Sequence, residues 1–188
     1  MKKVHITFVL ALFVAVASLQ AQTFTLNQKN SQLNWTGKAA FSTYELTGTL
    51  ESDKGSIVIS DNKIESLEVT VDMKSLDHKN NRLKSHLRGK DFFEVKKFTK
   101  ATFTLSEPVA IENGQAKLKG TLTIKNTSHQ EDMEAIVSVN DGNVMLSFQT
   151  KIDRTKYGVK FNSPSFFKKM KENAIADLFV LKGDLHFH

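Results

Sequence analysis

The stretch SLEVTVDMKSLDHKNNRLKSHLRGKDFFEVKKFTKATF, residues 66–103, contains two strand patterns separated by a short helical pattern. Apolar residues at 67, 69, 71 and 73 alternate with polar ones, and the alternation returns at 101 and 103. Such alternation is typical of a strand with one buried and one exposed face. Leu83 and Leu87 are four residues apart instead, which predicts a short helix ending near Gly89. The chain is therefore expected to be built mainly of antiparallel strands.

The same alternation continues beyond this stretch, at residues 118–124, 144–148 and 179–187. Turn signals separate the apolar runs, and they lie at 52–55, 60–62, 112–114 and 140–143.

These patterns predict an all-β fold of about eight to ten strands, and Pro164–Ile175 is expected to form a second short helix. Many hairpin strands with few helical connections favour a closed barrel over a sandwich, because closure removes exposed strand edges.

The N-terminus has the features of a signal peptide. Lys2 and Lys3 precede the apolar run Val4–Leu19, which is too short to span a bilayer comfortably. We expect cleavage after Ala21, so that residues 1–21 are removed and residues 22–188 form one exported domain. The periplasm is the expected location, with the extracellular space as the alternative.

Composition narrows the expected function. The chain has no cysteine, which excludes disulfides, thiolate metal sites and a lipoprotein anchor. Lysine and arginine number 26 against 20 acidic residues, for a net charge of +6. Export argues against a nucleic-acid partner, so this positive charge favours an anionic ligand or an anionic membrane surface.

Five motifs in this order resemble the YceI-like family. They are Leu33–Lys38, Ser66–Phe103, Gly120–Ile124, Ile152–Gly158 and Ser165–Phe167, and together the resemblance covers residues 23–187. The chain departs from the family where many members have histidine in the first hairpin and where Gly-Val-Thr-Lys-Pro follows the Gly120–Ile124 strand. Residues 126–130, Asn-Thr-Ser-His-Gln, replace the latter motif, and a looser hairpin is expected there.

The resemblance implies an extended antiparallel, lipocalin-like β-barrel of about eight strands with one or two short helical connections. It also implies that the lumen binds an isoprenoid or another long-chain lipid. The apolar residues predicted to line that lumen are Leu33, Trp35, Val69, Val71, Phe103, Leu105, Leu122, Phe148, Phe179 and Leu181.

Two basic connections, each with a Phe-Phe pair, are candidates for the entrance. Residues 79–100 hold eight Lys or Arg against two acids, and residues 151–171 hold seven against one. The hypothesis is that their aromatic residues grip the lipid while their cations meet an anionic head group or membrane surface. The entrance residues predicted in this way are Arg82, Arg88, Phe92, Phe93, Arg154, Phe166 and Phe167.

The residues alone leave two functions open. The first is carriage or sequestration of a lipid, and the second is a filled barrel that presents its basic face to a partner or membrane. We expect no enzyme, because His78, His86 and Asp91 lie close in sequence but not in a nucleophile motif. No cofactor and no metal site are expected. The oligomeric state is left open by the sequence.

Overall fold

The computed structural model describes residues 21–167 and 173–188, so the predicted signal peptide lies almost entirely outside the described residues. The strands are β1 (Gln22–Thr25), β2 (Gln32–Lys38), β3 (Glu45–Ser60), β4 (Lys63–Asp77), β5 (Lys100–Leu105), β6 (Val109–Ala110), β7 (Gln115–Ile124), β8 (Thr127–Asn140), β9 (Asn143–Asp153) and β10 (Leu178–Phe187). The helices are α1 (Asn81–Arg88) and the 3₁₀ helix η1 (Arg154–Tyr157).

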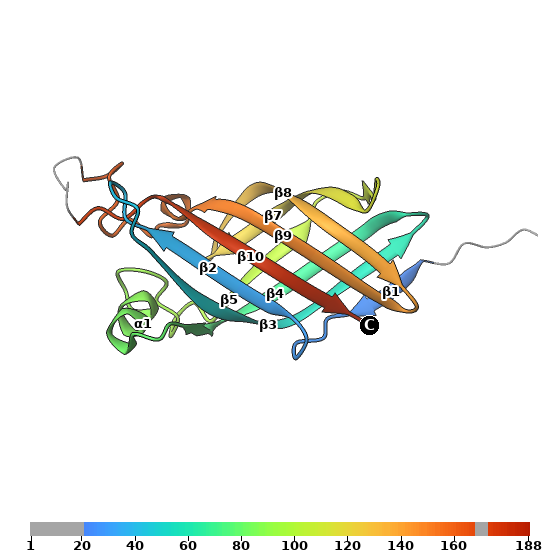
Figure 1. Cartoon of the computed structure of the whole chain (residues 1–188), viewed down its shortest axis with the longest axis horizontal. Coiled ribbons are helices and arrows are strands. Elements are labelled where there is room, and N and C mark those ends of the chain that lie inside the picture. Colours follow the sequence, from blue (N-terminus) through green and yellow to red (C-terminus); the bar gives the residue numbers. More distant parts are fainter. Residues whose placement is uncertain (1–20, 168–172) are drawn as a thin grey trace, which may run out of the picture.

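Eight of the strands close into an antiparallel barrel, as expected from the sequence. Their order is β3-β2-β10-β9-β8-β7-β5-β4, and β4 pairs again with β3 to close the ring. The barrel is elongated, and its strands cross the long axis obliquely (Figure 1). Closure leaves inward-facing apolar residues on every wall, which is why the alternation was so regular.

The two remaining strands complete one end of the barrel, which we call the closed end. β1 pairs with the second half of β3 and is joined to the end of β10 by the bridge between Leu26 and Phe187. β6 pairs with the start of β4 at Lys63 and Ile64. Both ends of the described chain lie at this end (Figure 1). The large side chains packed here are all buried, and they are Phe24, Leu26, Ile57, Ile64, Ile111, Val144 and Phe187.

Three of the four predicted turn regions are turns between strands, and the fourth prediction was wrong. Asp61-Asn62 and Asp141-Gly142 have the positive φ angles of tight hairpin turns. Residues 52–55 instead lie inside β3, where the register with β4 shifts between Ser52 and Lys54. Gly55 serves close packing here, because a Cβ atom on it would lie 2.7 Å from the carbonyl oxygen of Glu68. The polar sequence therefore marks a β-bulge and not a chain reversal.

The hairpin after β7 is also tighter than expected. Only Lys125 and Asn126 connect β7 to β8, and both adopt positive φ angles, of 51° and 59°. An asparagine tolerates this conformation well, so the departure from the family's motif does not loosen the turn.

The predicted helix near Leu83 is α1. The Asn80 side chain accepts hydrogen bonds from the backbone N–H groups of Arg82 and Leu83, and Gly89 ends the helix. The second predicted helix is not seen in the described part of Pro164–Ile175, where residues 164–166 form a turn; its central residues lie outside the described range. Among the described residues, no helix is long and apolar enough to cross a membrane.

Candidate functional site

The barrel encloses an apolar cavity of about 380 Å³. This size lies in the range of about 300–1,000 Å³ that is common for small-molecule sites. None of the packed residues of the closed end lines the cavity, so the cavity stops short of that end. At the opposite end its lining includes the exposed residues Lys38, Tyr44 and Asn173, so the cavity reaches the surface there. We call this second end the mouth.

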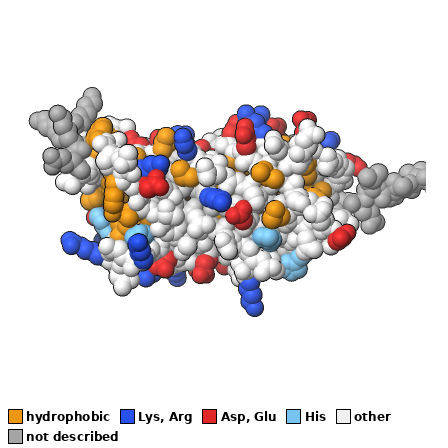
Figure 2. Space-filling model, viewed as in Figure 1, with side chains coloured by type: hydrophobic (Ala, Val, Ile, Leu, Met, Phe, Trp, Pro, Cys, Tyr) orange, Lys and Arg blue, Asp and Glu red, His pale blue; other side chains and the backbone are white. Residues whose placement is uncertain are grey.

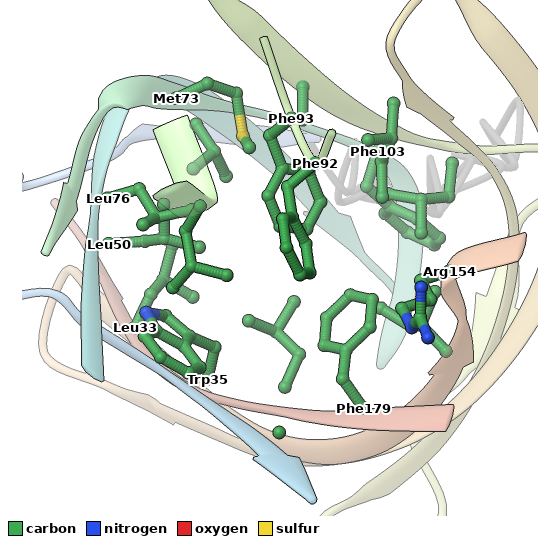
Figure 3. A pocket seen from close by; sticks show the side chains of 18 of the residues that line it. Leu33, Trp35, Leu50, Met73, Leu76, Phe92, Phe93, Phe103, Arg154 and Phe179 are labelled. Carbon is green, nitrogen blue, oxygen red and sulfur yellow. The ribbon is translucent and has the colours of Figure 1, made fainter. Parts of the chain in front are cut away.

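Most of the predicted lumen residues line this cavity. The structure places in its wall Leu33, Trp35, Val69, Val71, Phe103, Leu122, Phe148, Phe179 and Leu181. Several of these side chains point inward from opposite walls in Figure 3. Leu105 is not in the lining; it lies further along β5 and packs against the core beyond the cavity.

Three aromatic residues of the wall each cover a glycine on the neighbouring strand. The pairs are Trp35 with Gly48, Phe103 with Gly120, and Phe148 with Gly183. A Cβ atom on any of these glycines would overlap the aromatic ring. Because each glycine has no side chain, the aromatic ring lies over the glycine backbone. Less of the ring therefore extends into the lumen. The glycines therefore help to keep the cavity open.

Gly183→Val tests this role of the glycines. The added side chain should displace the Phe148 ring toward the lumen and lower the free energy of unfolding by about 1–3 kcal/mol. The double variant Gly183→Val/Phe148→Ala removes the overlap, so it should recover part of this loss in a double-mutant cycle measured by denaturant unfolding. Additive effects of the two substitutions would contradict the proposed coupling.

At the mouth, a short segment crosses the edge of the opening. It comprises residues 173–177, and its backbone is joined to the end of β2: Ala40 N–H donates to Ala174 O at 2.8 Å, and Ala176 N–H donates to Lys38 O at 2.9 Å. Four residues of this segment line the cavity. The segment therefore forms one side of the mouth.

Arg154 binds this segment through hydrogen bonds to its backbone carbonyl groups. Its guanidinium group donates from Nε to Ala176 O (3.0 Å), from Nη2 to Ile175 O (2.8 Å) and from Nη1 to Val159 O (2.7 Å). Asp177 lies 3.8 Å from Nη2, and only 4% of the Arg154 side chain is exposed. Burial lowers the pKa of this guanidinium from its ordinary value, whereas the nearby carboxylates raise it. Arginine remains charged in this setting because its ordinary pKa is so high.

The two basic connections meet on the other side of the mouth. His86 of α1 packs edge-on against Phe92 and Phe161, with ring centroids 5.0 and 4.8 Å apart. His86 Nε2 also lies 3.1 Å from a carboxylate oxygen of Asp91. α1 and the following residues thus contact the connection between β9 and β10, and both connections flank the mouth.

The predicted entrance residues are divided by the structure into three groups. Phe92, Phe93 and Arg154 line the cavity (Figure 3). Phe166 and Phe167 are exposed at the mouth end but do not line the cavity. Arg82 is exposed on α1, and Arg88 donates from Nε to Leu76 O at 2.7 Å. The cations of Arg88 and Arg154 are therefore engaged by backbone carbonyls of the protein itself.

The sequence prediction missed several lining residues. They are Tyr44, Leu46, Leu50, Met73, Leu76, Leu83, Leu87 and Ile175. Alternation at Leu46, Gly48 and Leu50 was present in the sequence and identifies the inner face of β3. The spacing of Leu83 and Leu87 indicates the apolar face of α1, but sequence alone does not show that this face covers the lumen.

Together the closed ring of strands and its apolar cavity define a lipocalin-like barrel. The sequence profile of the YceI-like domain matches residues 24–187, and the chain therefore belongs to the YceI-like family.

Relatives and solved structures agree with this assignment. A UPF0312 protein of Vibrio cholerae is 41% identical over 59 residues, which are 31% of each chain. A UPF0312 protein of Staphylococcus epidermidis is 32% identical over 110 residues, or 54% of this chain and 61% of that one. These alignments thus span less than two thirds of either relative.

Two solved structures show the same fold at lower identity. Burkholderia cenocepacia BcnA has a TM-score of 0.70 at 19% identity, and the match covers 86% of this chain and 98% of that one. A polyisoprenoid binding domain from Saccharophagus degradans, implicated in plant cell wall breakdown, has a TM-score of 0.64 at 16% identity, with 88% and 97% covered.

Proposed function

We propose that this protein binds one long-chain lipid of the isoprenoid type in the barrel lumen and carries or sequesters it without catalysis. The observation that carries this proposal is the apolar cavity, blind at one end and open at the other. Such a shape fits a molecule with a long apolar tail and one polar end. Membership of the YceI-like family and the shared fold with a polyisoprenoid binding domain support the isoprenoid class.

The distribution of polar groups gives the ligand an orientation. The charged residues of the described lining are Lys38 and Arg154, and both lie at the mouth. The walls beyond the mouth consist mainly of apolar side chains, so a charged head placed there would lose its hydration without an opposite charge nearby. We infer that the tail points to the closed end and the head group stays at the mouth.

The cavity also separates the alternatives that the sequence left open. A filled barrel would favour a pure interaction protein, whereas an apolar cavity that reaches the surface favours ligand binding. The described lining contains no serine, histidine, aspartate or glutamate. Among the described residues, no group of three His, Asp or Glu side chains is arranged to hold a metal ion.

We propose that this binding takes place outside the cytoplasm, in the periplasm. The support is the signal-like sequence of residues 1–21, with its lysines and its short apolar run. A lipid carrier in the envelope would keep an apolar chain out of water between membranes.

A series of lipids of increasing chain length tests the proposed ligand class. Each CH₂ group moved from water into the lumen contributes about 0.8 kcal/mol, so affinity should rise about fourfold per carbon. The rise should stop once the lumen is filled. Calorimetric titration with single-chain lipids kept below their micelle concentration measures this dependence. An affinity that does not depend on chain length would contradict lumen binding.

A further inference from the structure

Large apolar side chains are exposed around the mouth. Among the described residues, the exposed fractions are 69% for Phe41, 63% for Tyr44, 49% each for Phe166 and Phe167, and 50% for Leu178. We call these five residues the apolar rim. Figure 2 shows a band of hydrophobic side chains at this end of the molecule, besides smaller patches along the barrel.

Barrel packing does not explain this exposure. Phe41 and Tyr44 belong to the connection between β2 and β3, and a chain reversal on a protein surface is ordinarily polar. Exposed apolar clusters of this kind mark surfaces that contact another phase or molecule. Tyr44 also lines the cavity, so the rim is continuous with the lumen wall. A partner that covers the rim therefore covers the opening through which the ligand passes.

Positive charge accompanies the rim. Lys160 Nζ lies 4.3 Å from the centroid of the Phe166 ring. Within the described part of the chain, Lys160, Arg82 and Lys90 make no ion pair with an acidic side chain, although Lys84 pairs with Asp77 and Lys156 with Glu131. Aromatic residues mixed with lysine and arginine are the combination that suits the interface of an anionic bilayer.

We propose that the apolar rim docks the barrel, mouth first, on the surface of an anionic lipid bilayer. The lipid then moves between bilayer and lumen without crossing water. This inference rests on the proposed function, because it gives the lumen its source of ligand. A bilayer fits better than a protein partner, because the apolar rim and the basic residues Lys160, Arg82 and Lys90 together surround an opening that leads to an apolar cavity.

Single labelled sites test the docking directly, since the chain has no cysteine of its own. An environment-sensitive fluorophore is attached after Phe41→Cys or Phe166→Cys, with Met145→Cys on the outer face of β9 and Asp61→Cys at the closed end as matched controls. Vesicles contain phosphatidylglycerol and phosphatidylcholine, or phosphatidylcholine alone. With the anionic vesicles, the fluorescence emission of labels on the rim should shift to shorter wavelengths. Lipids that carry a spin label in the acyl chain should quench this emission. Equal responses at rim and control positions, or no response, would overturn the proposal.

Binding variants separate docking from lumen binding. Phe41→Ser/Phe166→Ser should lower the partition coefficient for anionic vesicles at least about tenfold, and Ile136→Ser on β8 should leave it unchanged. Lys160→Glu should weaken binding to the anionic vesicles more than to the neutral ones. The double variant should still bind monomeric single-chain lipid as the unaltered protein does. If neither the unaltered protein nor the variants bind this lipid, the result contradicts the proposed function and not the docking. Rim-dependent self-association without vesicle binding would show that the rim pairs two copies, and would overturn docking.

Discussion

Replacing Arg154 with methionine should lower the free energy of unfolding by about 3–5 kcal/mol, because the substitution removes one partner of a buried charged network. Three backbone carbonyls, those of Val159, Ile175 and Ala176, would lose the donors that now satisfy them. Asp177 would also lose its positive neighbour. Chemical denaturation followed by circular dichroism measures this change.

Two further variants make the Arg154 result specific. Arg82→Met removes an exposed cation of the same type and should change stability by less than about 0.5 kcal/mol. Arg154→Lys keeps the charge but not the planar fork of donors, and should recover only part of the loss. If Arg154→Met lowers the free energy of unfolding by less than about 1 kcal/mol, the segment of residues 173–177 does not depend on the hydrogen bonds from Arg154.

Val71→Trp should abolish most lipid binding while the barrel stays folded. Val71 is a half-buried residue of the cavity wall on β4, so a larger side chain there takes space from the ligand. Displacing about three CH₂ groups of the tail costs about 2.4 kcal/mol, which corresponds to roughly a 50-fold loss of affinity. Calorimetric titration with a single-chain lipid measures this loss.

The matched control for this experiment is Thr104→Trp. Thr104 lies on β5, beside the same strand, but is exposed on the outside of the barrel. The Thr104→Trp substitution should leave the affinity for the lipid unchanged to within about twofold, since no cavity space is lost. If the two tryptophan variants bind lipid equally well, the ligand does not occupy the cavity.

The barrel could be predicted because its signal is local. Alternation identifies the inward face of each strand, and closure follows from many such strands with few connections. Alternation does not report how far along the barrel axis a residue lies. Leu105 and Phe103 belong to one face of β5, yet only Phe103 reaches the cavity. The prediction of a turn at residues 52–55 was wrong because polar residues followed by glycine occur in β-bulges as well as in turns.

The mouth was harder to predict because its residues act through tertiary contacts. Arg154 was predicted as an entrance residue whose cation meets the head group, whereas its donors are used by carbonyls some twenty residues further along the chain. Phe41 and Tyr44 lie in a connection without periodicity, so no pattern distinguished them from an ordinary loop. The Phe-Phe pairs did indicate that both basic connections lie near the opening, and the structure brings them together through His86, Phe92 and Phe161.

The most direct test of the lumen's role is native mass spectrometry of the protein purified from its own host without detergent. Lipid extraction of the same sample, followed by mass analysis, identifies the class of any bound molecule. We expect one long-chain, isoprenoid-type lipid per barrel, which is lost in Val71→Trp and retained in Thr104→Trp. A protein that emerges free of lipid and takes up none when single-chain or isoprenoid lipids are added would contradict it.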